Sequence, residues 1–208
     1  MKDDIINRIT DGIKAREKRA QKPVIANVSN RHIHLCEMDM ERLFGKGYKL
    51  TKKKDLIQPG QYACNETISI RGEKREIKNV RVLGPLRKNT QVEISKTDAF
   101  VLGVNAPLRI SGDIKGSAAL TLIGPAGTIK LAEGCIIAKR HIHFAPEDAE
   151  FYGIKDSDII KVKCLGERGL VFDNVVARVS KTMALEFHID TDEANASGIT
   201  NGDKVIIL

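Results

Sequence analysis

The chain has 208 residues, of which 42% are hydrophobic and 29% charged, and it carries a formal net charge of +7. This length suits one large domain or two small ones with a buried core, and no apolar run approaches the roughly 20 residues of a membrane-spanning helix. Residues 1–4 do not begin a secretory signal, and the 4 cysteines form no CxxC pair, so we expect a protein of the reducing cytosol without disulfides.

The first predicted element is an amphipathic helix over residues 3–20, which carries an isoleucine stripe at helical spacing. The stripe consists of Ile5, Ile6, Ile9 and Ile13. It could pack on the body of the protein, or it could dock on a partner as a targeting tag, and the pattern leaves both readings open. Pro23 ends the helix, and residues 24–29 are predicted to form the first strand.

Short β-branched runs separated by turn residues make up most of the remaining chain. Short helices are predicted at residues 37–44 and 146–152. The predicted strands are residues 67–70, 80–82, 91–94, 119–123, 159–163, 169–172, 174–179 and 185–189. Turns such as Gln58-Pro59-Gly60 and Ser111-Gly112-Asp113 separate them. Short strands with few helices predict a mainly β fold of barrel type.

Two short stretches each place two histidines on one face of a predicted strand. They are Arg31-His32-Ile33-His34-Leu35 and Arg140-His141-Ile142-His143-Phe144, and each is followed by a short acidic helix. Alternate residues of a strand point to the same face with Cβ atoms roughly 6–7 Å apart, a span over which two imidazoles can hold one metal ion. The repeat indicates that the chain is an internal duplication.

The later parts of the two copies repeat the same spacing. The equivalent pairs are Asn79 and Asn174, Glu93 and His188, and Gly103 and Gly198. The first and second members are 14 residues apart in both copies, and the second and third are 10 apart. Glu93 and His188 therefore occupy equivalent positions, and each becomes a candidate third ligand.

Each copy thus offers three candidate metal ligands. They are His32, His34 and Glu93 in the first copy, and His141, His143 and His188 in the second. Both are familiar zinc sets that leave one coordination position open, and ligands of this kind without sulfur favour zinc. A lone His-x-His is weak evidence, but here the pair recurs. Cys36 and Cys64 are rival ligands that we expect to be buried or incidental thiols, and Glu66 is a weaker substitute for Glu93.

Arg87 is the candidate anion-binding residue. It stands six residues before Glu93 in a Gly-Pro bend, and its counterpart in the second copy is Thr182. A planar guanidinium suits bidentate binding of phosphate or of a developing oxyanion. The residue could equally be a surface arginine in a turn, and its position alone does not decide.

At these residues the chain resembles the phosphate propanoyltransferases, also called PduL-type phosphotransacylases, over essentially its whole length. The matching motifs include Val28-Ser29-Asn30-Arg31-His32-Ile33-His34-Leu35, Asn79-Val80-Arg81-Val82-Leu83-Gly84-Pro85-Leu86-Arg87, Gln91-Val92-Glu93-Ile94-Ser95 and His188-Ile189-Asp190-Thr191-Asp192-Glu193-Ala194-Asn195. The resemblance implies two β-barrels with a dinuclear zinc site, hence two zinc ions per chain held by the two ligand sets. It further implies that Arg87 acts at the phosphate.

The resemblance carries further expectations about the chain's organisation. It implies an N-terminal tag at residues 1–20, one barrel at residues 31–138, and a second barrel made of residues 21–30 and 139–208. Coenzyme A contacts are implied at Ser29, Lys54, Arg81, Leu83 and Asn195. The N-terminal helix resembles the targeting tag of metabolosome-associated members, which implies shell or core partners in a bacterial microcompartment and a role in propanediol degradation. The same basic, isoleucine-striped helix would equally suit a free cytosolic enzyme. We expect a cytoplasmic homodimer that binds neither nucleic acid nor membrane.

The predicted reaction converts a short-chain acyl-CoA (propionyl-CoA or acetyl-CoA) and phosphate reversibly into an acyl phosphate and CoA. Two other classes compete with it. A zinc hydrolase would use the same ligands to activate water and cleave acyl-CoA. A non-catalytic β-barrel binding module for nucleic acid would account for the +7 charge, but such modules interleave basic residues with stacking aromatics, and this chain has 3 Tyr, 6 Phe and no Trp.

Overall fold

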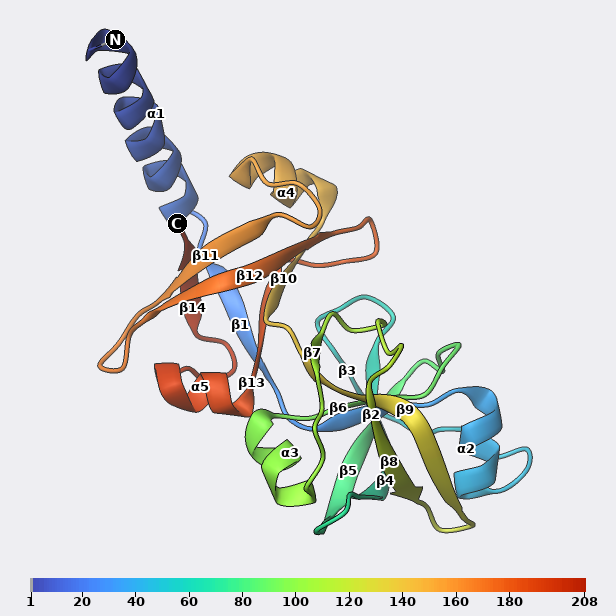
Figure 1. Ribbon diagram of the computed structural model, residues 1–208. Coiled ribbons are helices and arrows are strands. Elements are labelled where there is room, and N and C mark those ends of the chain that lie inside the picture. The colour runs from blue at the N-terminus through green and yellow to red at the C-terminus, as the bar shows by residue number, and fades with distance from the viewer. Residues whose placement is uncertain (1) are drawn as a thin grey trace. The chain divides into compact units, whose positions relative to one another are not determined.

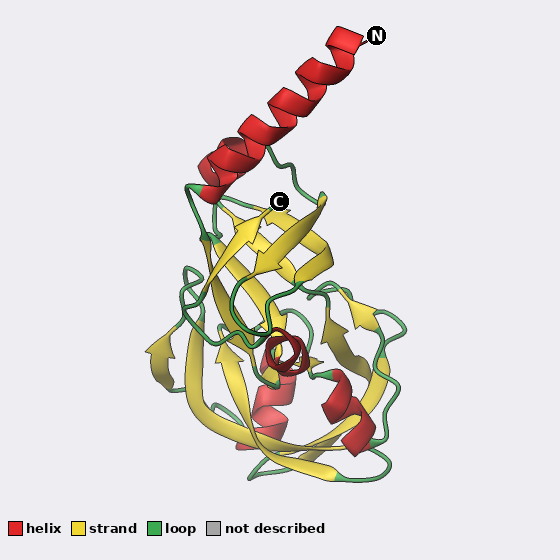
Figure 2. Ribbon diagram, turned by 90° about the vertical axis from the view of Figure 1, so that its left-hand side faces the viewer, coloured by secondary structure: helices red, strands yellow, loops and turns green. Residues whose placement is uncertain are grey.

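The computed structural model describes residues 2–208, with side chains from residue 4. The chain forms two compact units. The central unit consists of Ser29–Lys139 and Asp190–Asp192, and the terminal unit consists of the chain up to Val28, Arg140–Ile189 and Glu193–Leu208. Strands form most of both units, and apart from the N-terminal helix the helices are short (Figure 2). These findings confirm the predicted mainly β fold with an N-terminal helix.

A closed ring of strands forms the central unit. Its strands are β2 (His32–His34), β3 (Lys52–Asp55), β4 (Tyr62–Arg71), β5 (Glu76–Gly84), β6 (Gln91–Glu93), β7 (Leu108–Arg109), β8 (Ala118–Ile123) and β9 (Thr128–Ala138). Pairing runs β4-β5-β2-β6-β9-β8 and returns from β8 to β4, while β3 and β7 add to the sheet at β4 and β9. Helices α2 (Glu37–Phe44) and α3 (Lys96–Leu102) follow β2 and β6.

The terminal unit contains the second ring. Its elements are α1 (Lys2–Ala20), β1 (Val24–Ser29), β10 (His141–Phe144), α4 (Pro146–Tyr152), β11 (Ile159–Cys164), β12 (Val171–Val179), β13 (Glu186–Asp190), α5 (Thr191–Ser197) and β14 (Lys204–Ile207). The strands close a barrel in the order β1-β13-β10-β12-β11-β14 (Figure 1). In both rings the histidine strand pairs in parallel with one neighbour and antiparallel with the other.

The strands that precede the two histidine strands exchange rings. β1 comes directly before β2 in the chain but pairs with β13 and β14, whereas β9 comes directly before β10 but pairs with β6 and β8. Each ring therefore receives one strand from the chain segment that leads into the other. Each unit also has its own hydrophobic core, in which Ile33 and Ile142, the residues between the paired histidines, are fully buried.

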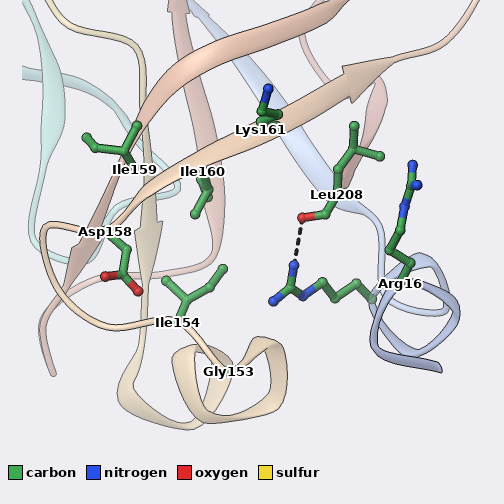
Figure 3. A pocket seen from close by; sticks show the side chains of 9 residues that line it. Arg16, Gly153, Ile154, Asp158, Ile159, Ile160, Lys161 and Leu208 are labelled. Atoms are coloured by element: carbon green, nitrogen blue, oxygen red, sulfur yellow. Dashed lines mark hydrogen bonds between the residues drawn. The ribbon is translucent and has the colours of Figure 1, made fainter. Parts of the chain in front are cut away.

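Helix α1 does not bury its isoleucine stripe. Ile5, Ile6, Ile9 and Ile13 are between 52% and 58% exposed, so the reading in which they pack on the body is wrong. The helix is held at its C-terminal end, where Arg19 donates to the carbonyl oxygens of Leu208 at 2.6 Å and Tyr152 at 3.1 Å. Arg19 and Leu208 line a cavity of about 540 Å³, which Figure 3 shows from close by. Among the described residues, no helix has the length and apolar character needed to cross a membrane.

Most predicted elements form where expected, and the differences have local causes. The helices at 37–44 and 146–152 and the strand at 24–29 are present with those bounds. The strands predicted at 169–172 and 174–179 are one strand, β12, which passes through Asn174 in the left-handed region (φ 55°). Helices α3 and α5 and strands β3, β7, β9 and β14 were not predicted. Helix α3 begins with a capping box between Ser95 and Asp98, a signal that was present in the sequence.

Candidate metal centres and anion site

The first ligand set lies on adjacent strands of the central unit. Strands β2 and β6 run antiparallel, with His32 opposite Glu93. One ring nitrogen of His32, one of His34 and one carboxylate oxygen of Glu93 lie within 4.8 Å of one another, and all three side chains are buried. His32 Nδ1 lies 2.8 Å from the carbonyl oxygen of Asn30, which leaves Nε2 facing Glu93 Oε2 at 3.5 Å. A backbone contact of this kind orients a ligating imidazole.

The second ligand set repeats this arrangement in the terminal unit. Strands β10 and β13 place His141 opposite His188, and ring nitrogens of His141, His143 and His188 again lie within 4.8 Å of one another. Behind them Glu186 is fully buried, with Oε2 3.0 Å from His188 Nε2 and Oε1 accepting from Asn27 Nδ2 at 2.7 Å. A carboxylate against a ligating histidine is a common supporting contact in metal sites.

The pKa values of His34 and His143 fit a metal. His34 Nδ1 and both ring nitrogens of His143 are buried and have no hydrogen-bond partner among the described residues. Burial, then the charges of His32 and Arg87, lowers the pKa of His34 well below its ordinary value. Burial, then the charges of His188 and His141, lowers the pKa of His143 to about 2. Neutral imidazoles with unused nitrogens are the form that binds divalent metals.

Glu93 is held as a carboxylate. Burial by itself would raise its pKa, but the neighbouring His32 and His34 and a hydrogen bond from Ser111 bring that pKa below its ordinary value. An ionised, buried carboxylate beside two imidazoles forms a complete three-ligand set. The chemistry of these donors therefore fits a divalent metal in both units.

Arg87 lies beside the first ligand set. It lines a cavity of about 240 Å³ together with His34. The remaining lining residues are Pro59, Gly60, Gln61, Gly84 and Pro85. The backbone N–H of Arg87 donates to Leu35 O at 2.8 Å, and its Nη1 donates to Ser111 Oγ at 3.1 Å. The structure thus places this guanidinium in a cavity next to a candidate metal ligand, where a small anion could be held by positive charge.

Comparison with known proteins places the chain in a family. Residues 25–200 match the family model described as phosphate propanoyltransferase. The chain belongs to the phosphate propanoyltransferase family. The phosphate propanoyltransferase of Thermotoga maritima is 56% identical over 207 residues, covering 96% of this chain and 99% of that protein. That of Lachnoclostridium phytofermentans is 55% identical over the full length of both chains, and that of Salmonella typhimurium is 50% identical over 90% of each.

These matches confirm the resemblance and identify the family as one of acyltransferases. The family match begins at residue 25 and so starts after helix α1. All six candidate ligands and Arg87 fall within it.

The residues expected around coenzyme A are distributed over both units. Lys54 pairs with Ala63, which pairs with Leu83, which in turn pairs with His34, so these residues form one row across β3, β4, β5 and β2. Arg81 pairs with His32, but its Nη1 donates to the carbonyl oxygens of Cys64 and Asn65.

Ser29 ends β1, and Asn195 is exposed on α5. Lys54, Leu83 and the first ligand set thus lie on one sheet. The Arg81 guanidinium is bound to backbone carbonyl oxygens. The coenzyme contacts themselves stay a prediction.

The rival ligands lie outside both sets. Strand β2 ends at His34, and Cys36 occupies the N-cap position of helix α2 instead of continuing the strand. Cys64 is buried, and burial raises its pKa to about 11. The Glu66 carboxylate accepts hydrogen bonds from Tyr48 and from Thr51, which fasten the segment before β3.

Sequence reasoning missed four polar residues around the two sets. They are Gln91 and Ser111 in the central unit, and Arg178 and Glu186 in the terminal unit. Gln91 and Glu186 each stand two residues before the third candidate ligand, so the register of the duplication could have found them. Arg178 pairs with His143, at the position where Leu83 pairs with His34. The second copy has Thr182 at the position of Arg87, but Arg178 gives it an arginine on the strand next to its histidines.

Proposed function

We propose that this protein transfers a short acyl group, propionyl or acetyl, between coenzyme A and phosphate, with one zinc ion in each ligand set. The observation that carries the proposal is the recurrence of a three-ligand set in both units, with Arg87 in a cavity beside the first. The relatives named phosphate propanoyltransferase support the reaction class. The neutral, unpartnered imidazole nitrogens support the metal.

In the proposed reaction one phosphate oxygen attacks the carbonyl carbon of the thioester. The carbon–sulfur bond breaks, CoA leaves as a thiolate that takes up a proton, and acyl phosphate remains. Arg87 binds the phosphate and fixes its orientation, which replaces a bimolecular encounter by a positioned one. Its positive charge also stabilises the tetrahedral oxyanion. When bound, zinc supplies Lewis acidity at such an oxygen, and the six ligands named above would hold it.

We favour direct attack by phosphate over an acyl-enzyme, because three of the four thiols are poor candidates for the nucleophile. The three buried thiols have pKa values raised by burial, to about 11 for Cys64 and Cys164 and about 12 for Cys135, so they are poor nucleophiles near neutral pH. Quenching the enzyme with acyl phosphate and mapping peptides by mass spectrometry tests this point. A stoichiometrically acylated side chain would contradict direct attack.

The experiment that tests the proposed function measures CoA release from propionyl-CoA with and without phosphate. A transferase releases CoA rapidly only when phosphate or arsenate is present, and acyl phosphate accumulates in step with CoA. A zinc-dependent hydrolase would release CoA equally well without phosphate and yield the free acid. Equal rates in the two conditions therefore overturn the proposal.

We also propose that the isoleucine stripe of α1 docks on shell or core proteins of a bacterial microcompartment. Its exposure and the attachment of α1 through Arg19 support a helix that can be recognised by a partner. An Ile9→Asp/Ile13→Asp double variant should stay active but lose co-sedimentation with microcompartments. Asn7→Asp, on the same exposed helix, should co-sediment like wild type. Co-sedimentation of the double variant at the wild-type level would rule out this docking.

A further inference from the structure

Ser111 connects Arg87 to Glu93. It lies in the turn after β7, 18 residues beyond Glu93 in the chain. Its hydroxyl donates to Glu93 Oε1 at 2.7 Å and accepts from Arg87 Nη1 at 3.1 Å and Gln91 Nε2 at 2.9 Å. A serine hydroxyl has one proton and two lone pairs. The proton and both lone pairs of Ser111 are used. The hydroxyl accepts from the charged Arg87 and the neutral Gln91 and donates to the Glu93 carboxylate.

Gln91 fixes this serine in place. The Gln91 side chain is buried, and its Nε2 donates to Glu93 Oε1 at 2.6 Å as well as to Ser111. Its Oε1 accepts from the backbone N–H of Gly112 at 2.7 Å, which ties the turn itself to β6. The amide therefore holds the backbone and the side chain of the turn against the ligand strand. Such a connected network is stiffer than its separate bonds.

We propose that Ser111 is a positioning residue that sets the Arg87 guanidinium relative to the Glu93 carboxylate. This inference rests on the proposed function, in which Arg87 binds phosphate and Glu93 holds a metal. Ser111 has no hydrogen-bonding capacity left for substrate, so its effect is transmitted through the two side chains that it joins. The result is a fixed separation between the anion-binding charge and the metal-binding carboxylate.

The test compares Ser111→Ala with Ser117→Ala. Ser117 is a matched control because it lies in the same connection between β7 and β8 and is similarly half-buried. Among the described residues, its hydroxyl bonds to Ile114 O and Gly134 N and not to the ligand set. In Ser111→Ala the KM for phosphate should rise about tenfold, the loss typical of one hydrogen bond to a charged group, while the KM for acyl-CoA changes little. Ser117→Ala should match wild type in both.

A second readout does not depend on turnover. Ser111→Ala should lose one equivalent of bound zinc to a chelator several-fold faster than wild type, because the Glu93 carboxylate has lost a donor. Ser117→Ala should lose zinc at the wild-type rate. If wild type shows no phosphate-dependent CoA release, the proposed function fails, and the zinc-release rates still test the contact between Ser111 and Glu93.

A double-mutant cycle separates positioning from general damage. If Ser111 acts through Arg87, Ser111→Ala should have almost no further effect on kcat/KM for phosphate in an Arg87→Ala background. Additive losses would overturn the inference. It would also be overturned if Ser111→Ala left the KM for phosphate unchanged, even if zinc release became faster, because Ser111 would then act on Glu93 alone.

Discussion

Arg87 and Glu93 illustrate what single residues contribute to the first site. Both contact the Ser111 hydroxyl, and Arg87 shares its cavity with His34. The three candidate ligands of each copy could be predicted because they repeat with a fixed spacing. Ser111 could not be predicted in this way, because the second copy has no equivalent serine. It comes close to Glu93 only through the fold of the turn after β7.

The first residue-scale prediction concerns Arg87. Arg87→Ala should keep its bound metal but lose about 100-fold or more in kcat/KM, the usual cost of removing a group that stabilises an oxyanion. Lys88→Ala, at the adjacent exposed position, is the matched control and should behave as wild type. Steady-state kinetics with metal analysis of the same samples decides. Normal turnover in Arg87→Ala would contradict the proposal that Arg87 binds the phosphate.

The second prediction concerns the metal ligands. Glu93→Ala and His188→Ala should each lower bound zinc from about two ions per chain towards one, since a three-ligand site that loses a ligand holds zinc much more weakly. The exposed Glu76→Ala is the control. Elemental analysis after gel filtration gives the count. Two retained ions in both variants would show that the sets are not the binding sites.

The third prediction concerns buried thiols at alkaline pH. Burial, and secondarily the charge of Asp98, raises the pKa of Cys135 to about 12. An unfolded cysteine has a pKa of about 8.5. The stabilising contribution of the protonated thiol is therefore complete below that value and is lost as pH rises through the folded-state pKa, because the unfolded chain releases its proton first.

The free energy of unfolding should accordingly fall between pH 8 and pH 10, as urea titrations at the two values can measure. Cys135→Ala should show a smaller fall than wild type over the same interval, whatever its stability at pH 8. An equal fall in the free energy of unfolding of both proteins would contradict a raised pKa for Cys135.

At the scale of elements, the duplication is visible in contacts as well as in spacing. Arg31 forms an ion pair with Asp98 at 2.8 Å, and Arg140 forms one with Glu193 at the same distance. The arginine before each histidine strand thus binds an acid five residues after each third candidate ligand.

Elements with regular apolar spacing, such as α2 and α4, could be predicted with their bounds. Strand β9 escaped prediction because its exposed half carries polar residues and Gly134 adopts a φ of 133°.

The fourth prediction tests the equivalence of β5 and β12. Asn79 and Asn174 adopt φ values of 57° and 55° at matching positions of these strands. Replacing either by alanine should lower the free energy of unfolding by about 1 kcal/mol, since a Cβ without a local hydrogen-bonding group disfavours the left-handed region. Glycine at either position should be tolerated better. Urea unfolding of the four variants tests this, and a loss in only one copy would contradict the equivalence.

At the scale of the whole molecule, two rings built on one plan each carry a three-ligand set, and among the described residues only the central unit combines its set with Arg87. The mainly β architecture and the duplication could be predicted from strand spacing and repeated motifs. Gln91 and Ser111 organise the first site. Their interactions depend on the register of β6 and on the turn after β7, which brings Ser111 back to the ligand set. Sequence spacing alone does not carry that information.

The central claim is that zinc held by these two sets supports acyl transfer to phosphate. The most direct measurement follows phosphate-dependent CoA release and bound zinc in one preparation, before chelation, after it, and after zinc is restored. The account predicts that activity disappears as zinc is removed and returns when about two equivalents per chain are bound again. Activity that survives complete removal of divalent metal would contradict it.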